Sequence, residues 1–311
     1  MENKIKKATR EAYGEALVEM GAEFPNLVVM DADLSGSTKT SMFKKAYPDR
    51  FFNMGIAEAN LYGAAAGLAV SGKIVCASTF AMFATGRAFE IIRNSIGYTH
   101  ANVKVCATHA GITVGEDGAS HQTFEDLALM RTIPGMTVVN PCDSVSAKAL
   151  LHKVVEMDGP CYVRLGRAAV ENLYEEGYEF ELGKANVLRE GNDVAIIATG
   201  LMVQDAMAAA EKLADEGIQA RVIDMHTIKP LDEDIIIKAA QETKAIVTAE
   251  EHSVIGGLGS AVAEVVTKHA PTRIEMVGQK DTFGESGKPD ELREKYGMTA
   301  NDIYMAVKTV L

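Results

Sequence analysis

Residues 55–70 read GIAEANLYGAAAGLAV, a run of small apolar residues that carries one carboxylate, Glu58. A glutamate in the first turn of a helix is favoured by the helix dipole, and that is the simpler interpretation of Glu58 alone. The alternative is a buried carboxyl. Burial disfavours the charged form, so such a group tends to keep a proton or to share one with a nitrogen of a bound ring.

A second loop, residues 115–122, reads GEDGASHQ and places Asp117 and His121 between and beside glycines. Single histidines are more often structural than catalytic, but His109 precedes the same loop, and two histidines around an acid favour a functional site. An apolar strand expected at 103–107 leads into this loop, and parallel sheets place ligands at the carboxyl ends of their strands. Phe80 and Phe83 lie between the two loops, either as core or as a stacking platform for a ring.

Apolar runs alternate with amphipathic stretches along the first half of the chain. This alternation predicts short buried strands at 27–30, 74–77, 103–107, 137–139 and 161–163. It predicts helices between them at 5–22, 59–70, 88–98 and 145–157. Strands that alternate with helices indicate an α/β fold with a mostly parallel sheet flanked by helices.

The alternation stops at 168–191, where the acidic, aperiodic stretch 171–179 predicts a surface linker. A second α/β series follows, with strands expected at 193–198, 220–224, 245–249 and 273–277 and helices at 203–216, 232–241, 260–269 and 300–311. We therefore expect two domains, 1–180 and 181–311, each with a mostly parallel sheet flanked by helices. Glu251 and His252 follow a strand of the second domain without metal-site spacing and indicate an interface or a turn.

Composition excludes several classes of protein. The net charge of -12 argues against nucleic-acid binding. The four cysteines lack CxxC spacing and lie in or beside apolar stretches, which predicts buried reduced thiols. The sequence shows no signal peptide and no apolar run of about 18 residues, so we expect a cytoplasmic protein without membrane contact.

These residues resemble the cofactor-activating half of a transketolase, a thiamine diphosphate enzyme. The resemblance rests on Gly-Ile-x-Glu ending at Glu58, on Thr-Phe-x-x-Phe with Phe80 and Phe83, and on Gly-Glu-Asp-Gly-x-Ser-His ending at His121. It implies that Glu58 bonds a pyrimidine nitrogen and activates the cofactor, on the aromatic platform of Phe80 and Phe83. Asp33 matches an aspartate beside the cofactor. Gly86 stands where many relatives have a third aromatic residue, which leaves one side of the predicted pocket more open.

The resemblance also implies transfer of a two-carbon ketol unit from a ketose phosphate to an aldose phosphate. His121 matches a catalytic histidine at the reacting oxygens, a suitable residue for moving protons near neutral pH, and Asp117 matches a contact to a sugar hydroxyl. The matching contacts to the sugar phosphate fall at Arg10, Ser37, His109 and Arg167. Arg164 is a rival of Arg167 for this role.

The half of a transketolase that holds the diphosphate through Mg²⁺ has no match in this sequence. Gly115–Gly118 contains letters of the Gly-Asp-Gly magnesium signature but not its order, so we expect no metal ligands on this chain. The resemblance therefore implies the C-terminal subunit of a split transketolase, which needs an N-terminal partner subunit that carries the Mg²⁺ ligands. A heterotetramer of type α2β2 is the expected assembly.

Other functions remain open at this stage. A 1-deoxy-D-xylulose-5-phosphate synthase shares the Asp-Gly-x-Ser-His loop but normally occupies one long chain. The beta subunit of a pyruvate or branched-chain dehydrogenase has a similar length but lacks that run. A non-catalytic scaffold subunit predicts loss of Glu58 or the histidines, and all of these residues are present.

Overall fold

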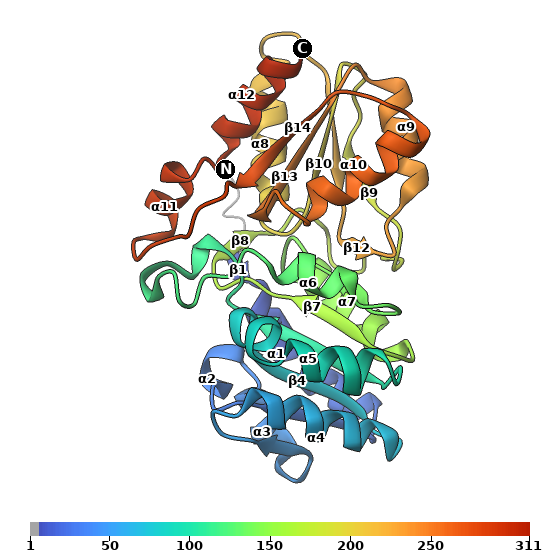
Figure 1. Cartoon of the computed structure of the whole chain (residues 1–311), viewed down its shortest axis with the longest axis vertical. Coiled ribbons are helices and arrows are strands. Elements are labelled where there is room, and N and C mark those ends of the chain that lie inside the picture. Colours follow the sequence, from blue (N-terminus) through green and yellow to red (C-terminus); the bar gives the residue numbers. More distant parts are fainter. Residues whose placement is uncertain (1–5) are drawn as a thin grey trace.

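The computed structural model describes residues 6–311 and shows two α/β domains stacked along the long axis of the molecule (Figure 1). Within these residues, the first domain is built on a seven-stranded sheet of order β12-β6-β7-β5-β4-β2-β3. Its strands are β12 (Thr227–Lys229), β6 (Thr137–Val139), β7 (Cys161–Arg164), β5 (Val103–Thr108), β4 (Ile74–Phe80), β2 (Leu27–Asp31) and β3 (Phe51–Asn53). All neighbours in this sheet run parallel except β12 and β6.

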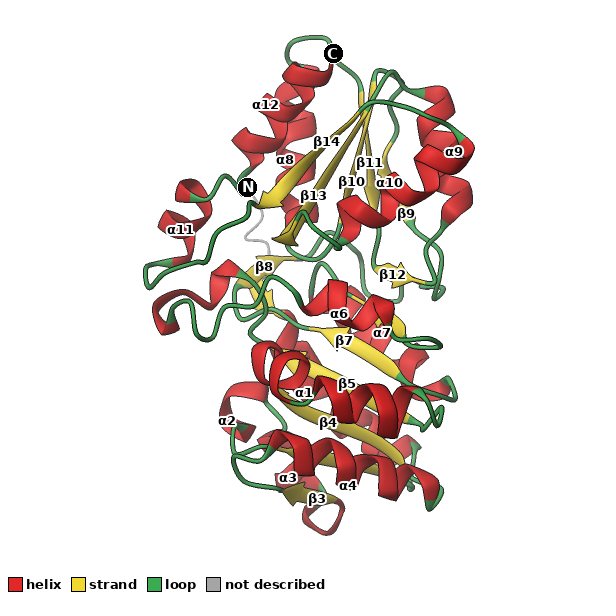
Figure 2. Ribbon diagram, in the orientation of Figure 1, coloured by secondary structure: helices red, strands yellow, loops and turns green. Residues whose placement is uncertain are grey.

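Helices cover both faces of this sheet (Figure 2). They are α1 (Thr9–Glu23), α2 (Ser35–Thr38), α3 (Ser41–Ala46), α4 (Glu58–Val70), α5 (Phe89–Ile91), α6 (Asp126–Thr132) and α7 (Ser144–Glu156). The central strands β2 and β5 are buried along their whole length, because both faces of a parallel sheet pack against helices.

Within the described residues, the second domain holds a five-stranded sheet of order β14-β13-β10-β11-β9. Its strands are β14 (Ile274–Gln279), β13 (Ile246–Ser253), β10 (Val194–Ala198), β11 (Ala220–Asp224) and β9 (Asn186–Arg189), of which only β9 pairs antiparallel. The helices are α8 (Met202–Ala214), α9 (Glu233–Glu242), α10 (Leu258–His269), α11 (Pro289–Lys295) and α12 (Ala300–Val310). Strand β12 leaves this part of the chain and extends the sheet of the first domain, which ties the two domains together.

The predicted α/β class is confirmed, and each predicted strand is present with ends that differ by no more than four residues. The helix predicted at 5–22 is wrong at its start: Ile5 lies outside the described residues, and Lys6–Ala8 form β1, which pairs antiparallel with β8 (Ala169–Glu171). The helix predicted at 88–98 is interrupted, because α5 is flanked by π-helical turns at Phe83–Arg87 and Ile92–Gly97.

The surface linker predicted at 171–179 is wrong at Tyr174. Tyr174 and the adjoining Phe180 are buried, and their rings pack against each other with centroids 4.7 Å apart. The buried carboxylate of Asp143 accepts hydrogen bonds from the backbone N–H groups of Leu173 and Tyr174. Aromatic burial therefore outweighs the acidic character of the neighbouring residues.

The four cysteines are free thiols, and all are buried, as predicted. Among residues 6–311, no helix combines the length and the apolar character needed to cross a membrane.

Candidate active site

Glu58 is the first residue of α4 and is buried, with only 5% of its surface exposed. The chain reaches it through Gly55, whose φ of +70° lies in the region that favours glycine. Its side chain lines a cavity of about 360 Å³ at the carboxyl edge of the first sheet. Phe83, His121 and Asp33 line the same cavity, so residues from four separate stretches of sequence converge here.

The partner of Glu58 is a residue that sequence reasoning missed. Arg87 Nη1 donates a hydrogen bond to Glu58 Oε1 over 3.1 Å, and its guanidinium carbon lies 4.1 Å from the centroid of the Phe83 ring. Arg87 follows Gly86, the glycine that stands where many relatives have a third aromatic residue. A planar guanidinium stacks on aromatic faces, so Arg87 contacts both the Glu58 carboxyl and the Phe83 ring beside the cavity.

The aromatic residues predicted to form a platform lie together. Phe80 is buried at the end of β4, and its ring stacks on the His109 imidazole with centroids 3.9 Å apart. The Phe80 and Phe83 rings are stacked at 5.9 Å, and His121 meets Phe83 edge-on at 5.2 Å. The structure therefore brings both histidines and both phenylalanines into one cluster, although they come from two different loops.

A group of cations surrounds His109. Arg10 Nη1 lies 3.4 Å from His109 Nε2 and donates to the Ser37 carbonyl oxygen over 2.9 Å. Burial, together with the charges of Arg10 and Arg167, lowers the pKa of His109 to about 3, so this ring is neutral at physiological pH. Burial also lowers the pKa of Arg10. Such a concentration of positive charge favours binding of an anion.

Arg164 and Arg167 occupy different environments. Arg164 is buried and forms an ion pair with Asp126, with its Nε 2.7 Å from Oδ2 and its Nη2 3.1 Å from Oδ1. Arg167 is partly exposed, and its Nη1 donates to the Val114 carbonyl at 2.5 Å and to Glu116 at 3.0 Å. Arg164 is thus engaged inside the fold, whereas Arg167 reaches the loop that carries the predicted substrate contacts.

The remaining predicted residues lie at the surface of this region. Asp33 has a φ of +66° and exchanges hydrogen bonds with the Asn53 side chain. Asp117 is exposed on its loop, and His121 is half-buried with its Nδ1 3.0 Å from Ser120 Oγ. Both residues are accessible to a ligand entering from solvent.

The donors of this cavity fit an aminopyrimidine ring. A buried carboxyl group can form a hydrogen bond to a ring nitrogen, and the neighbouring Phe83 ring offers an apolar face for stacking. In the part of the chain that the structure describes, no group of three or more His, Cys, Asp or Glu side chains is arranged to hold a metal ion.

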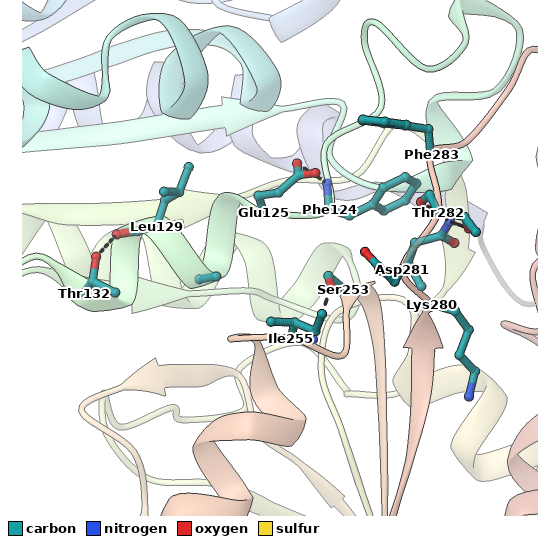
Figure 3. A pocket seen from close by; sticks show the side chains of 12 residues that line it. Phe124, Glu125, Leu129, Thr132, Ser253, Ile255, Lys280, Asp281, Thr282 and Phe283 are labelled. Carbon is teal, nitrogen blue, oxygen red and sulfur yellow. Dashed lines mark hydrogen bonds between the residues drawn. The ribbon is translucent and has the colours of Figure 1, made fainter.

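A larger cavity of about 470 Å³ lies elsewhere, in a groove between the domains (Figure 3). Phe124, Glu125 and Leu129 line one side of it, and Ile255 and the residues after β14 line the other. It is largely apolar and contains none of the predicted site residues. We therefore place the candidate active site at the smaller Glu58 cavity.

Comparison with known proteins identifies the family of the chain. Residues 5–172 match the family described as "Transketolase, pyrimidine binding domain", and residues 183–303 match "Transketolase, C-terminal domain". The chain belongs to the transketolase family. The predicted resemblance is thereby confirmed, together with a thiamine-type pyrimidine domain and a transferase class.

The chain matches relatives over nearly their whole length. The chain is 52% identical over 302 residues to a putative transketolase C-terminal section of Methanocaldococcus jannaschii, covering 96% of this chain and 95% of the relative. It is 44% identical to the 6-deoxy-6-sulfo-D-fructose transketolase subunit SqwH of Clostridium sp., covering 97% and 94%. A solved split gene transketolase, described as an inactive beta4 tetramer, superposes with a TM-score of 0.92 at 57% identity over 98% of both chains. This transketolase chain therefore corresponds to the C-terminal section of a split transketolase.

Proposed function

We propose that this chain is the C-terminal subunit of a two-chain transketolase that moves a two-carbon ketol unit from a ketose phosphate to an aldose phosphate. The observation that carries the proposal is the buried Glu58 carboxyl, which faces a cavity of about 360 Å³ beside the Phe83 ring. A buried carboxyl next to an aromatic face in a transketolase pyrimidine domain suits one ligand group in particular, the aminopyrimidine of thiamine diphosphate.

Each residue of the site has a role in this proposal. Thiamine diphosphate, when bound, supplies the nucleophilic carbon and the electron sink for cleavage of the sugar carbon–carbon bond. Glu58 holds a proton at the pyrimidine nitrogen, and Phe80 and Phe83 orient the ring. Asp33 lies beside the ring at the edge of the cavity. His121 moves protons at the ketose oxygens, and its half-buried position leaves it open to substrate.

The far end of the sugar binds at the cationic group around His109. Arg10 and Arg167 supply the charge, Ser37 contributes a polar group, and neutral His109 offers a hydrogen bond. Asp117 contacts a sugar hydroxyl. The sugar named for the Clostridium relative carries a sulfonate rather than a phosphate at its end, so assays need both kinds of donor.

The partner is an N-terminal subunit that carries the diphosphate-binding domain and the Mg²⁺ ligands. We infer an α2β2 assembly, in which the chain is inactive without that partner. The related split gene transketolase, described as an inactive beta4 tetramer, supports both self-association and inactivity of such a chain alone. In this proposal residues 1–180 form the pyrimidine-binding domain and residues 181–311 the C-terminal domain, and the complex acts in the cytoplasm.

Reconstitution with the N-terminal subunit tests the proposal. We expect ketol transfer from xylulose 5-phosphate to ribose 5-phosphate with thiamine diphosphate and Mg²⁺, and none by either subunit alone. Glu58→Gln should lower kcat at least about a hundredfold, the usual size of a lost acid–base group, whereas the exposed control Glu90→Gln should not.

Two results would support other functions. Condensation of pyruvate with glyceraldehyde 3-phosphate, without ketol transfer, would assign the chain to the deoxyxylulose phosphate synthases. Full activity of the Glu58→Gln complex would refute the role of Glu58 and favour a scaffold subunit.

A further inference from the structure

The loop that carries Asp117 and His121 lies between the two domains, and the C-terminal domain holds its backbone from one side. Glu251 lies in β13 of that domain and is buried, with 4% of its surface exposed. Its Oε1 accepts a hydrogen bond from the backbone N–H of Thr113 over 2.6 Å. This bond joins positions 138 residues apart in the sequence and crosses from one domain to the other.

The loop backbone is shaped to admit this carboxylate. Gly111 has a φ of +81°, and a Cβ at that position would lie 2.5 Å from Glu251 Oε1. Real Cβ atoms do not approach an oxygen so closely, so only glycine allows Glu251 to reach the Thr113 N–H. The Glu251 carbonyl oxygen also accepts a hydrogen bond from Arg164 over 2.8 Å, which fixes the strand that carries the carboxylate.

A second contact holds the other end of the loop. Gln122 Nε2 donates to the Glu285 carbonyl of the C-terminal domain over 2.9 Å and to the Gly115 carbonyl of its own loop over 3.2 Å. At Gly118, whose φ is +76°, a Cβ would lie 2.5 Å from Ser286 Oγ. The segment before α11 therefore packs directly on the loop backbone; in Figure 1, α11 lies beside the green loop of the first domain.

The two contacts bracket the residues that face the substrate. Thr113 and Gln122 are buried, while Asp117 between them is exposed and His121 is half-buried. A fixed backbone with free side chains is the arrangement that catalytic loops need, because misplacement by about 1 Å can lower a rate about a hundredfold.

We propose that Glu251 is a positioning residue, through which the C-terminal domain sets the geometry of the loop that carries Asp117 and His121. The C-terminal domain then contributes to the active site through the backbone of this loop. This inference rests on the proposed function for its effect on turnover, but its effect on the loop itself is independent of the reaction.

The neighbouring residue offers a matched control. Glu250 is equally buried in the same strand, and its carboxylate accepts from the backbone N–H groups of Leu258 and Gly259 at 2.7 and 2.8 Å. It caps the start of α10 within its own domain. Glu250→Ala therefore removes buried hydrogen bonds of the same kind without touching the catalytic loop.

The first measurement is hydrogen–deuterium exchange of the chain itself. Glu251→Ala should speed exchange of the amides at 111–122 at least about tenfold, since the Thr113 N–H loses its acceptor. Glu251→Gln keeps an acceptor oxygen and should restore most of the protection. Glu250→Ala should speed exchange at the start of α10 and leave 111–122 unchanged. Unchanged exchange at 111–122 in Glu251→Ala would overturn the proposal, whatever reaction the chain catalyses.

The second measurement is steady-state kinetics of the complex with the N-terminal subunit. Glu251→Ala should lower kcat/KM for the ketose phosphate about 10- to 100-fold, with the Kd for thiamine diphosphate within about twofold, because Glu58 and Phe83 lie on other elements. Glu250→Ala should keep kcat/KM at a comparable loss of stability. An equal loss of kcat/KM in both variants would mean that Glu251 only stabilises the fold and does not position the loop. Absence of ketol transfer by the wild-type complex would instead refute the proposed function and leave the exchange result standing.

Discussion

Asp224 makes the stability of this chain depend on pH in a direction that is unusual for a carboxylate. It is the last residue of β11 and is fully buried. Its Oδ2 accepts hydrogen bonds from the Tyr174 hydroxyl at 2.7 Å and the Cys142 thiol at 3.5 Å, while Oδ1 has no hydrogen-bond partner among the described residues. Burial, with no cation to offset it, raises the pKa of Asp224 to about 7.

The size of the effect follows from linkage. The ordinary pKa of the group is 3.8, and each pH unit between that value and about 7 is worth about 1.4 kcal/mol. Folded Asp224 keeps a proton that the unfolded chain has released, so its contribution is fully present below about pH 4 and is lost as pH rises through about 7. Between pH 5 and pH 8 we expect the contribution of Asp224 to the free energy of unfolding to fall by about 3 kcal/mol.

The Asp224→Asn variant isolates this contribution. Equilibrium urea unfolding of wild type and variant from pH 5 to pH 8 gives the difference in free energy of unfolding at each pH. The buried neutral His109 and His226, whose pKa values are lowered by burial to about 3 and about 4, titrate with the opposite sign and cancel in that difference. As pH rises from 5 to 8, we expect the free energy of unfolding of the variant to increase by about 3 kcal/mol relative to that of the wild type. Parallel pH profiles would refute the reasoning.

Two further predictions concern the site. Arg87→Met leaves the buried Glu58 carboxyl without its partner and should lower the free energy of unfolding by about 1 kcal/mol. The loss should be smaller in a Glu58→Gln background, where only the contact with Phe83 and a neutral hydrogen bond are removed; equal losses in both backgrounds would contradict a charge pairing of the two side chains. Arg164→Met leaves the buried Asp126 carboxylate without its ion-pair partner and should lower the free energy of unfolding in urea by about 3–5 kcal/mol. Arg167→Met should change the free energy of unfolding by no more than about 0.5 kcal/mol and should raise KM for the sugar phosphate. The reverse pattern would exchange the roles of the two arginines.

Much of the fold was predictable because its sheets are buried and parallel. Strands such as β2 and β5 are short, largely apolar runs, which can be recognised as buried strands in a sequence. The short strands β1 and β12 were not predicted. Each has three residues and includes lysine, so neither shows an apolar pattern, and each exists only because a distant strand offers it a partner.

The residues of the candidate site were predictable where they belong to sequence motifs, but not where only the three-dimensional fold brings them to the site. Glu58, Phe83 and His121 come from recognisable patterns, and the structure brings them to one cavity. Arg87 belongs to no recognisable sequence pattern. It contacts Glu58 and Phe83 because it ends the π-helical turn that follows β4. Glu251 was expected at an interface or a turn, and its hydrogen bond to the Thr113 N–H places it at the interface between the two domains.

The residues around the Glu58 cavity divide the proposed site between this chain and its proposed partner. The lining of the Glu58 cavity includes exposed residues, among them Ile56 with 78% of its surface accessible, so part of the proposed cofactor site is open to a neighbouring subunit. The loop held by Glu251 and the cations around His109, in contrast, are built from residues of this chain. We therefore expect the N-terminal subunit to govern cofactor affinity, and this chain to govern how the sugar is held. Exchange of N-terminal subunits between split transketolases should change the Kd for thiamine diphosphate more than the preference among sugar phosphates, and the opposite outcome would contradict this division.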